Sequence, residues 1–429
     1  MIDKLFESGR IEEIYGKDPQ IISYQKERFG RILKGYGEHF GGSDDLHIFS
    51  AAGRSEIGGN HTDHQRGHVL AASLNIDSLA VVSAVDDPVI TLYSEGYETY
   101  KIDLSNLDKV ASEAGTTASL IRGVAAGFAK KGFKTGGFNA YVTSDVLGGS
   151  GLSSSASFES LIGVILSGLF NDNKVSTVDI AKIGQFAENQ YMDKPCGLMD
   201  QMACSVGGFV HIDFAKKSDN DPFFDDDYPW IEKIDFDPSD YGYDLCITDT
   251  KASHADLTDE YAAIPIEMKS VAKYFGKEVL SEIDEEEFLA KIPDIRKVTG
   301  DRAVMRAIHF LGENKRVIAE AESLREKDFD RFLRRFSASA RSSYEYLQNI
   351  YPVAADQQGV AIALAISDMV LSSPSKGVTR VHGGGFAGTI QTFVKKDFSD
   401  EYIAAMNKLL GDGASRKYSI RKYGCVQII

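Results

Sequence analysis

Residues 148–157 read Gly-Gly-Ser-Gly-Leu-Ser-Ser-Ser-Ala-Ser, and an apolar segment with helical spacing follows them. Glycines let a backbone approach a bulky anion closely. The first N–H groups of a helix lack partners within it, and the helix dipole makes that end partly positive. The stretch therefore predicts a phosphate-binding loop that leads into a helix. It is not a Walker loop, because no Gly-Lys-Ser or Gly-Lys-Thr follows, and taken alone it could be a flexible linker or a plain helix cap.

The bulk composition of the 429 residues is that of a globular protein large enough for two domains. The formal net charge of −16 argues against nucleic acid and anionic membranes as partners, so an anionic ligand would need local positive charge or a metal ion. No apolar run is long enough to cross a bilayer and the first residues carry no secretion pattern, so we expect a cytoplasmic location. The four cysteines fit neither a zinc site nor a disulfide scaffold.

Hydrophobic periodicity predicts helices and strands that alternate irregularly, which indicates an α+β arrangement of two lobes. Residues 76–85 and 89–94 are expected to form a strand pair joined by an Asp-Asp-Pro turn at 86–88. Helices are expected over residues 1–40, 117–131, 154–170 and 180–191 and through much of 250–369, and further strands over 47–52, 138–146, 208–214, 244–249 and 388–394 and near 418 and 426–429.

A second segment, residues 53–64, combines flexible backbone with many hydrogen-bonding side chains. Arg54 follows a predicted strand, where functional groups often lie. Asn60, His61 and Asp63 could together contact several hydroxyl groups of a polar ligand. A structural turn and a metal cluster are the alternatives, although the spacing fits no known zinc pattern. The metal-ligating residue types in and beside the segment are His61, Asp63, His64 and His68.

A third segment, residues 383–388, reads Gly-Gly-Gly-Phe-Ala-Gly and lies between two predicted strands. Alone it would be a tight turn or a bulge. It holds more glycine than a turn needs, so we expect its backbone to approach a ligand or a neighbouring loop closely.

Taken in chain order, as residues 53–64, 148–157 and 383–388, the three segments resemble motifs of the GHMP small-molecule kinases, and the continuation Gln-Arg-Gly-His-Val-Leu at 65–70 resembles the galactokinase branch. Glu188 with Pro-Cys-Gly-Leu-Met-Asp-Gln at 195–201 strengthens the resemblance, and Thr-Asp-Glu-Tyr at 258–261 adds weaker support. The resemblance implies a two-lobed GHMP-kinase-like fold, with an N-terminal mixed-sheet domain over residues 1–230 and a C-terminal ferredoxin-like α+β domain over residues 231–429.

The resemblance implies transfer of the γ-phosphoryl group of ATP to the anomeric hydroxyl of D-galactose, with Mg²⁺ as cofactor and no protein partner. Phosphoryl transfer needs in-line positioning and neutralised charge. By resemblance, Asp200 accepts or orients the hydroxyl proton, and Arg54 keeps Asp200 ionised and stabilises the transition state. Without the resemblance, Asp200 could be a helix cap and Arg54 a structural salt bridge. This function requires the glycine–serine stretch and the Asp200 segment to share one site.

The same resemblance implies the binding residues. The phosphate loop would bind through backbone N–H and hydroxyl groups, and oxygen ligands would hold Mg²⁺. The residues implied to bind ATP are Ser94, Gly149, Ser150, Gly151, Leu152, Ser153, Ser154 and Ser155; those implied to hold Mg²⁺ are Ser155 and Glu188; those implied to contact the sugar are Asn60, His61, Thr62, Asp63, Gly197 and Tyr261.

The chain departs from the family pattern within its motifs. The family usually has Glu where this chain has Asn60, which leaves the substrate breadth open. It commonly has Asn where this chain has Glu56. A kinase of another sugar, such as N-acetylgalactosamine or a pentose, and a non-catalytic sugar sensor are therefore alternatives. The complete serine run at 153–157 argues against the sensor. Further departures are Ala52 where Pro is common, His64 where Tyr is common and Ala387 where Gly is common.

Overall fold

The computed structural model describes residues 2–43, 45–146, 152–194, 196–215, 221–252 and 257–429. The chain divides into two compact units. Neither is one continuous segment, because residues 55–71 belong to the second unit and the last residues of the chain return to the first. The predicted domain division at residues 230 and 231 stays a prediction. Unit 1 comprises Met1–Arg54, Ala72–Gly208 and Ile420–Ile429, and unit 2 comprises Ser55–Ala71 and Phe209–Ser419.

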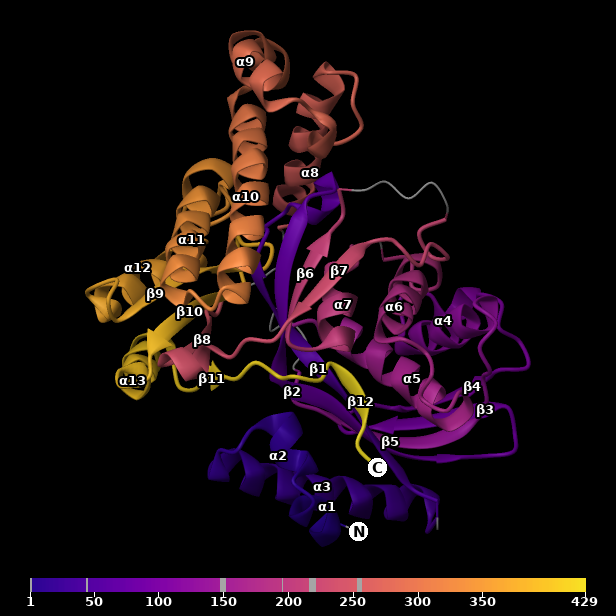
Figure 1. Cartoon of the computed structure of the whole chain (residues 1–429). Helices are drawn as coiled ribbons and strands as arrows, with labels where there is room; N and C mark the ends of the chain where they lie inside the picture. The colour runs from indigo at the N-terminus through magenta and orange to yellow at the C-terminus, as the bar shows by residue number, and fades with distance from the viewer. Residues whose placement is uncertain (1, 44, 147–151, 195, 216–220, 253–256) are drawn as a thin grey trace. The chain divides into compact units, whose positions relative to one another are not determined.

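Unit 1 combines a mixed sheet with helices (Figure 1). Six strands follow the order β12-β1-β2-β5-β3-β4; β3 and β5 are parallel, whereas β1–β12, β2–β5 and β3–β4 are antiparallel. The strands are β1 (His47–Gly58) and β2 (His68–Ala84), which both continue into unit 2, then β3 (Val89–Ser94), β4 (Thr99–Asp103), β5 (Phe138–Ser144) and β12 (Cys425–Gln427). The helices are α1 (Ile2–Glu7), α2 (Arg10–Tyr15), α3 (Pro19–Phe40), η2 (Ala111–Glu113), α4 (Thr117–Lys130), α5 (Ser154–Phe170), α6 (Thr177–Gln190) and α7 (Met199–Val206).

Residues 76–84 and 89–94 lie in strands, one residue short of the prediction at position 85, but the prediction that the two strands pair was wrong. Strand β5 lies between β2 and β3, with Val142 opposite Ala80 on one side and Ser94 on the other. The turn signal at 86–88 is local, and it carries no information about a strand from later in the chain that inserts between its two arms.

Helices α5, α6 and α7 pack against one another and carry the predicted catalytic residue Asp200 and the predicted Mg²⁺ ligands Ser155 and Glu188 (Figure 1). The bounds of α5 agree with the helix predicted over residues 154–170. Ser153 precedes α5 in a left-handed conformation with φ of 61°, which turns the chain into the helix. The hydroxyls of Ser160 in α5 and Ser205 in α7 lie 2.8 Å apart and join the two helices. Asp200 thereby occupies the first turn of a helix that is tied to the phosphate-loop helix.

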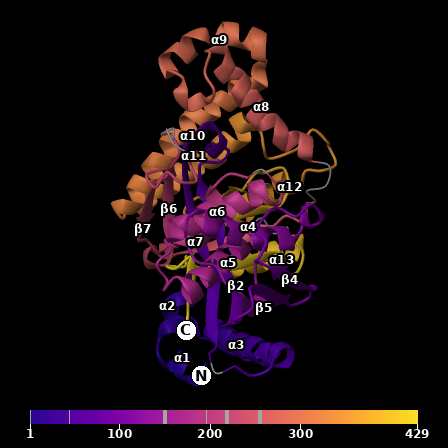
Figure 2. The ribbon, with the colours of Figure 1, turned by 90° about the vertical axis from the view of Figure 1, so that its right-hand side faces the viewer.

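Unit 2 contains a four-stranded antiparallel sheet in the order β11-β8-β10-β9, with Arg380 of β9 opposite Gln391 of β10. The long helices α10 and α11 lie side by side in both views (Figure 2). The strands of the unit are β6 (Phe209–Asp213), β7 (Trp230–Ile234), β8 (Tyr243–Asp249), β9 (Gly377–His382), β10 (Thr389–Lys395) and β11 (Ser415–Tyr418). Its helices are η1 (Asp63–Gln65), η3 (Pro238–Tyr241), α8 (Thr258–Tyr274), η4 (Leu280–Glu282), α9 (Glu285–Thr299), α10 (Asp301–Arg325), α11 (Phe329–Ser342), η5 (Ser343–Leu347), α12 (Gly359–Leu371) and α13 (Ser399–Leu410).

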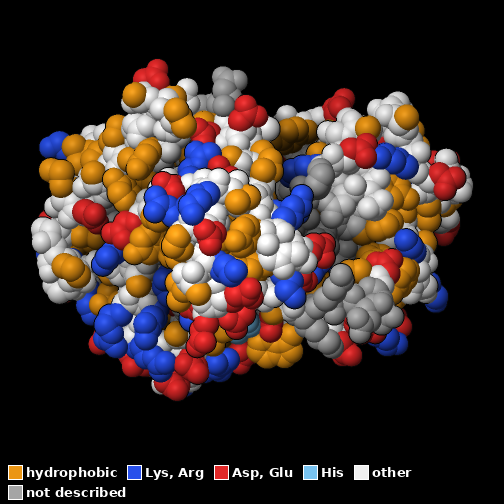
Figure 3. Space-filling view, turned by 90° about the horizontal axis from the view of Figure 1, so that it is seen from above, with side chains coloured by type: hydrophobic (Ala, Val, Ile, Leu, Met, Phe, Trp, Pro, Cys, Tyr) orange, Lys and Arg blue, Asp and Glu red, His pale blue; other side chains and the backbone are white. Residues whose placement is uncertain are grey.

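The mixture of helices with parallel and antiparallel strand pairs confirms the α+β class. Within the described ranges, no helix combines the length and the apolar character that a membrane crossing requires. Acidic and basic side chains are interspersed on the face in Figure 3, so the net charge of −16 does not gather into one patch there.

Candidate active site

Arg54 and Asp200 form a two-point ion pair within unit 1. Nε of Arg54 donates to Oδ1 of Asp200 at 2.8 Å, and Nη2 donates to Oδ2 at 2.9 Å. The arginine side chain is only 9% exposed, whereas the aspartate side chain is 36% exposed. A bidentate guanidinium holds the carboxylate in one orientation, and the partial exposure leaves that carboxylate accessible for acid–base chemistry.

The surroundings of Asp200 favour its ionised form. Burial alone would raise the pKa of Asp200, but the charge and hydrogen bonds of Arg54, together with a hydrogen bond from the Ser153 hydroxyl, outweigh burial and hold the pKa below its ordinary value. Its place in the first turn of α7 adds the favourable end of the helix dipole. Asp200 is therefore negatively charged at neutral pH.

The serine end of the glycine–serine stretch lies beside this ion pair. The Ser153 hydroxyl donates to Oδ2 of Asp200, and the backbone N–H of Arg54 donates to the carbonyl of Leu152 at 3.3 Å. The structure thus brings the end of the predicted phosphate loop to the Asp200 segment. Ser154 begins α5. The predicted ATP-binding residues Gly149, Ser150 and Gly151 lie outside the described residues.

Ser155 and Glu188, the predicted Mg²⁺ ligands, are in direct contact. The Ser155 hydroxyl donates to Oε1 of Glu188 at 3.0 Å, and Gln201 donates to Oε2 at 2.9 Å. The Lys194 ammonium also bonds to Oε1. A hydroxyl beside an anionic carboxylate is a donor set that a hard cation accepts. The sequence analysis missed Lys194, although it directly precedes the motif at 195–201.

Glu159 of α5 is a buried acid that the sequence analysis also missed. Burial raises the pKa of Glu159 well above its usual range, and the charge of Glu188 raises it further. Gln201 donates to both carboxyl groups, at 3.2 Å to Oε2 of Glu159. These surroundings therefore favour the protonated form of Glu159 beside the charged Glu188. A signal was available, because Glu159 is the one charged residue in the segment 154–170.

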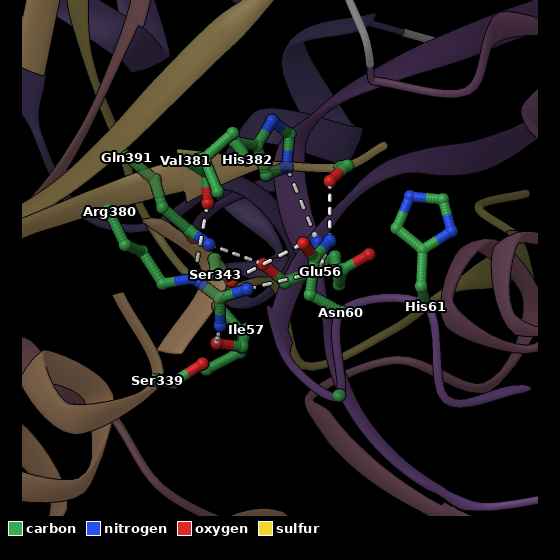
Figure 4. Close-up of polar contacts among 12 residues, drawn as sticks. Glu56, Ile57, Asn60, His61, Ser339, Ser343, Arg380, Val381, His382 and Gln391 are labelled. Carbon is green, nitrogen blue, oxygen red and sulfur yellow. Dashed lines mark hydrogen bonds and ion pairs between the residues drawn. The ribbon is translucent and has the colours of Figure 1, made fainter. Parts of the chain in front are cut away.

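Asn60, a predicted sugar ligand in unit 2, is completely buried. Its Nδ2 donates to Oε1 of Glu56 at 2.9 Å and to the carbonyl of Gly383 at 2.6 Å. Its Oδ1 accepts from the hydroxyl of Ser343 at 3.4 Å (Figure 4). The same oxygen also accepts from Nδ2 of Asn349 at 2.6 Å. The amide therefore uses both donors and both acceptor positions within the protein.

His61 and Tyr261 hold the next two carbonyls of the glycine-rich turn. Nε2 of His61 lies 3.0 Å from the Gly384 carbonyl, and the Tyr261 hydroxyl donates to the Gly385 carbonyl at 2.7 Å. Burial lowers the pKa of His61 to about 3, with a smaller contribution from His64, so the ring is neutral and Nε2 carries the proton that it donates. These contacts confirm the predicted close approach of the turn to a neighbouring segment.

The side chains of Thr62 and Asp63 differ in whether protein groups already occupy their hydrogen-bonding positions. The buried Thr62 hydroxyl bridges the carbonyls of Gly59 at 2.8 Å and His68 at 2.6 Å. Asp63 is a partly exposed residue at the start of η1. No hydrogen bond or ion pair from another described residue reaches its carboxylate. Asp63 is thus available to accept hydrogen bonds from ligand hydroxyls.

The alternative of a metal cluster in this segment is not supported. His61 pairs with His64 at 3.4 Å, whereas His68 pairs with His211 at 3.1 Å. Over the ranges that the structure describes, no group of three or more His, Cys, Asp or Glu side chains is arranged to hold a metal ion.

Ser94 and Gly197 are the remaining predicted binding residues, and both lie in unit 1. Ser94 is the last residue of β3, and Gly197 is an exposed residue shortly before α7. Their roles stay predictions.

Comparison with known proteins gives two matches to family descriptions. Residues 119–208 match the GHMP kinases N terminal domain, and residues 34–84 match the galactokinase galactose-binding signature. Among curated relatives, a galactokinase of Actinobacillus pleuropneumoniae is 28% identical over 412 residues, which are 94% of this chain and 96% of the relative. A galactokinase of Clostridium acetobutylicum is 29% identical over 394 residues, with 90% and 92% covered.

Solved structures share the fold. Lactococcus lactis galactokinase complexed with galactose superposes with a TM-score of 0.75 at 21% identity, over 93% of this chain and 99% of that one. Mevalonate kinase of Methanococcus jannaschii gives a TM-score of 0.59 at 14% identity, over 89% and 99%.

Proposed function

The chain belongs to the GHMP kinases and is an ATP-dependent sugar kinase, and we propose that it transfers the γ-phosphoryl group of ATP to the anomeric hydroxyl of D-galactose, giving galactose 1-phosphate and ADP. The observation that carries the proposal is the group Arg54–Asp200–Ser153, in which a partly exposed carboxylate is kept ionised at the end of a serine-rich loop. The match of residues 34–84 to a galactose-binding signature supports the sugar.

Asp200 orients the anomeric hydroxyl and accepts its proton. The hydroxyl oxygen forms a bond to the γ-phosphorus while the bond from that phosphorus to the bridging oxygen breaks, and ADP leaves with the electron pair. Arg54 keeps Asp200 ionised and stabilises negative charge on the transferring group. Ser153 fixes the second carboxylate oxygen, so that Asp200 meets the hydroxyl in one orientation.

The phosphates of ATP are bound by residues 149–155, with Ser94 as a further contact. Ser155 and Glu188 would hold Mg²⁺, and a bound Mg²⁺ neutralises charge on the phosphate oxygens. Lys194 and Gln201 keep the Glu188 carboxylate in a fixed position beside Ser155.

Asp63 binds the sugar by accepting hydrogen bonds from two adjacent hydroxyl groups. A site that pairs hydroxyl groups rejects analogues that leave its polar groups unsatisfied. The other proposed sugar contacts are His61, Gly197 and Tyr261, whereas the Thr62 hydroxyl is buried and bonded to backbone carbonyls. The proposed substrates are small molecules, and the cytoplasmic location stays a prediction.

A panel of sugars, each incubated with ATP and Mg²⁺, tests the proposal. We expect ADP release with D-galactose, and phosphorus NMR should place the phosphate on the anomeric oxygen. Turnover of N-acetylgalactosamine or a pentose without turnover of galactose would refute the substrate. Binding of galactose and ATP without ADP release would favour the sensor.

A further inference from the structure

The side chains of Glu56, Asn60 and Arg380 form a buried polar cluster in unit 2 (Figure 4). We infer that Asn60 is a positioning residue and not a sugar ligand: this polar cluster fixes the glycine-rich turn at 383–385 against the segment that carries Asp63. The inference rests on the proposed function, because it concerns the sugar site of the same reaction. It also explains why Glu56 and Asn60 carry the Glu and Asn of the family pattern in exchanged positions.

The hydrogen bonds of Asn60 leave no position for a substrate. A primary amide offers two N–H donors and two acceptor positions, and all of them are used by protein groups. The residue has no exposed surface. A sugar hydroxyl could reach it only by displacing a protein partner and leaving that partner buried and unpaired, which is unfavourable.

The charges explain why the two residue types are exchanged together. The Arg380 side chain has no exposure and the Glu56 side chain has 6%, and Nη2 lies 3.2 Å from Oε1. The same oxygen accepts from Asn60. One buried cation therefore matches one buried anion, and a neutral donor at position 60 completes the pair. A carboxylate at both positions would place like charges in contact in a buried site.

The surroundings of a neighbouring acid also disfavour further negative charge. Glu320 of α10 is buried, and burial together with the charge of Glu313 raises its pKa well above the usual range. Glu313 keeps its own charge because Arg316 lies 2.7 Å away. An additional carboxylate at position 60 alone would have to bind a proton or disrupt the polar cluster.

The glycine-rich turn is held from two sides. Asn60 donates to the Gly383 carbonyl, and the N–H of Phe386 donates to the Asn349 carbonyl at 2.6 Å. Gly385 has φ of 83°, and a Cβ there would lie 2.1 Å from the Asn349 carbonyl oxygen. The turn consequently has one conformation, in which its next two carbonyls bind His61 and Tyr261. Loss of Asn60 would remove the attachment at the Gly383 carbonyl and loosen those at the Gly384 and Gly385 carbonyls.

The first test compares Asn60→Ala with Asp63→Asn as a matched control in the same segment. In the absence of sugar, a positioning residue already makes its contacts, so we expect Asn60→Ala to lower the melting temperature by about 5 °C or more. Asp63→Asn should shift it by less than about 1 °C while raising the KM for the sugar. If Asn60→Ala raises the sugar KM with an unchanged melting temperature, Asn60 is a ligand and the inference is wrong.

The second test exchanges the pair, with Glu56→Asn, Asn60→Glu and the double variant. We expect each single change to lower the melting temperature and to lower kcat/KM by about tenfold. The double variant should recover at least half of each loss. If Asn60→Glu does not fold, recovery of folded protein in the double variant gives the same answer. Losses that simply add would overturn the inference. The melting temperatures need no turnover, so a failure of galactose phosphorylation would refute the proposed function without touching this result.

Discussion

Two arginine–carboxylate pairs in this chain have the same chemistry and different surroundings. In unit 1, Arg54 holds Asp200, whose side chain is 36% exposed at the start of α7. In unit 2, Arg380 holds Glu56, whose side chain is 6% exposed. The first carboxylate can meet a ligand and exchange a proton, whereas the second is enclosed by protein groups and orients backbone. Accessibility, more than residue type, separates the proposed catalytic pair from the proposed positioning pair.

The largest expected effect concerns the exposed pair. Asp200→Asn removes the charge and the proton acceptor, so kcat should fall by about 10³-fold or more. Galactose binding, measured by calorimetry, should persist because the proposed sugar contacts are unchanged. Asp193→Asn, at a surface carboxylate that is 61% exposed, is the control and should keep its kcat. A similar kcat for the two variants would contradict the role of Asp200.

The enclosed pair should matter mainly for stability. Arg380→Met leaves Glu56 buried without its cation, and we expect a loss of about 3–5 kcal/mol in the free energy of unfolding in urea. The control is Arg341→Met, which breaks an exposed pair with Glu345 and should cost less than about 1 kcal/mol. Equal losses would show that burial does not distinguish the two pairs.

A smaller effect is expected at the proposed metal ligand beside the exposed pair. Glu188→Gln removes an anionic oxygen, so the Mg²⁺ concentration for half-maximal activity should rise by about tenfold. Glu159→Gln is the control, because burial and the charge of Glu188 favour the neutral form of Glu159, and its Mg²⁺ titration should match that of the unchanged protein. A titration that Glu188→Gln leaves unaltered would remove Glu188 from the metal site.

The smallest expected effect is a pH dependence at the glycine-rich turn. His61 has a pKa of about 3 when folded and an ordinary value of 6.5, so the unfolded chain binds a proton that the folded chain does not between these values. Acidification from pH 6.5 to 5.5 should therefore cost about 1 kcal/mol of unfolding free energy through this residue. In His61→Gln, the unfolding free energy from urea titrations at the two pH values should therefore fall by about 1 kcal/mol less than in the unchanged protein. An equal fall in the unfolding free energy of the variant and of the unchanged protein would show that the His61 ring is exposed to water.

Much of the proposed catalytic group could be predicted from local sequence. The glycine–serine stretch, Arg54 after a strand and the Asp200 segment each carry a chemical signal within a few residues, and the structure brings Ser153, Arg54 and Asp200 into contact. The pairing of β2 and β3 was mispredicted because β5 comes from a distant part of the chain. The commitments of Asn60 were missed for the same reason, since Ser343, Asn349 and Gly383 lie almost 300 residues away or more.

The order of amino acids alone is enough to identify the kinase family, the α+β class and the residue types for phosphoryl transfer, because these depend on short motifs and local periodicity. The folded chain decides which of those polar side chains remain open to a ligand and which are consumed by the protein. Asp63 and Asn60 are three residues apart and are both plausible sugar ligands by type. Only the segments that pack around them leave one carboxylate available and saturate the other side chain, because hydrogen-bonding capacity is finite and buried groups must be paired.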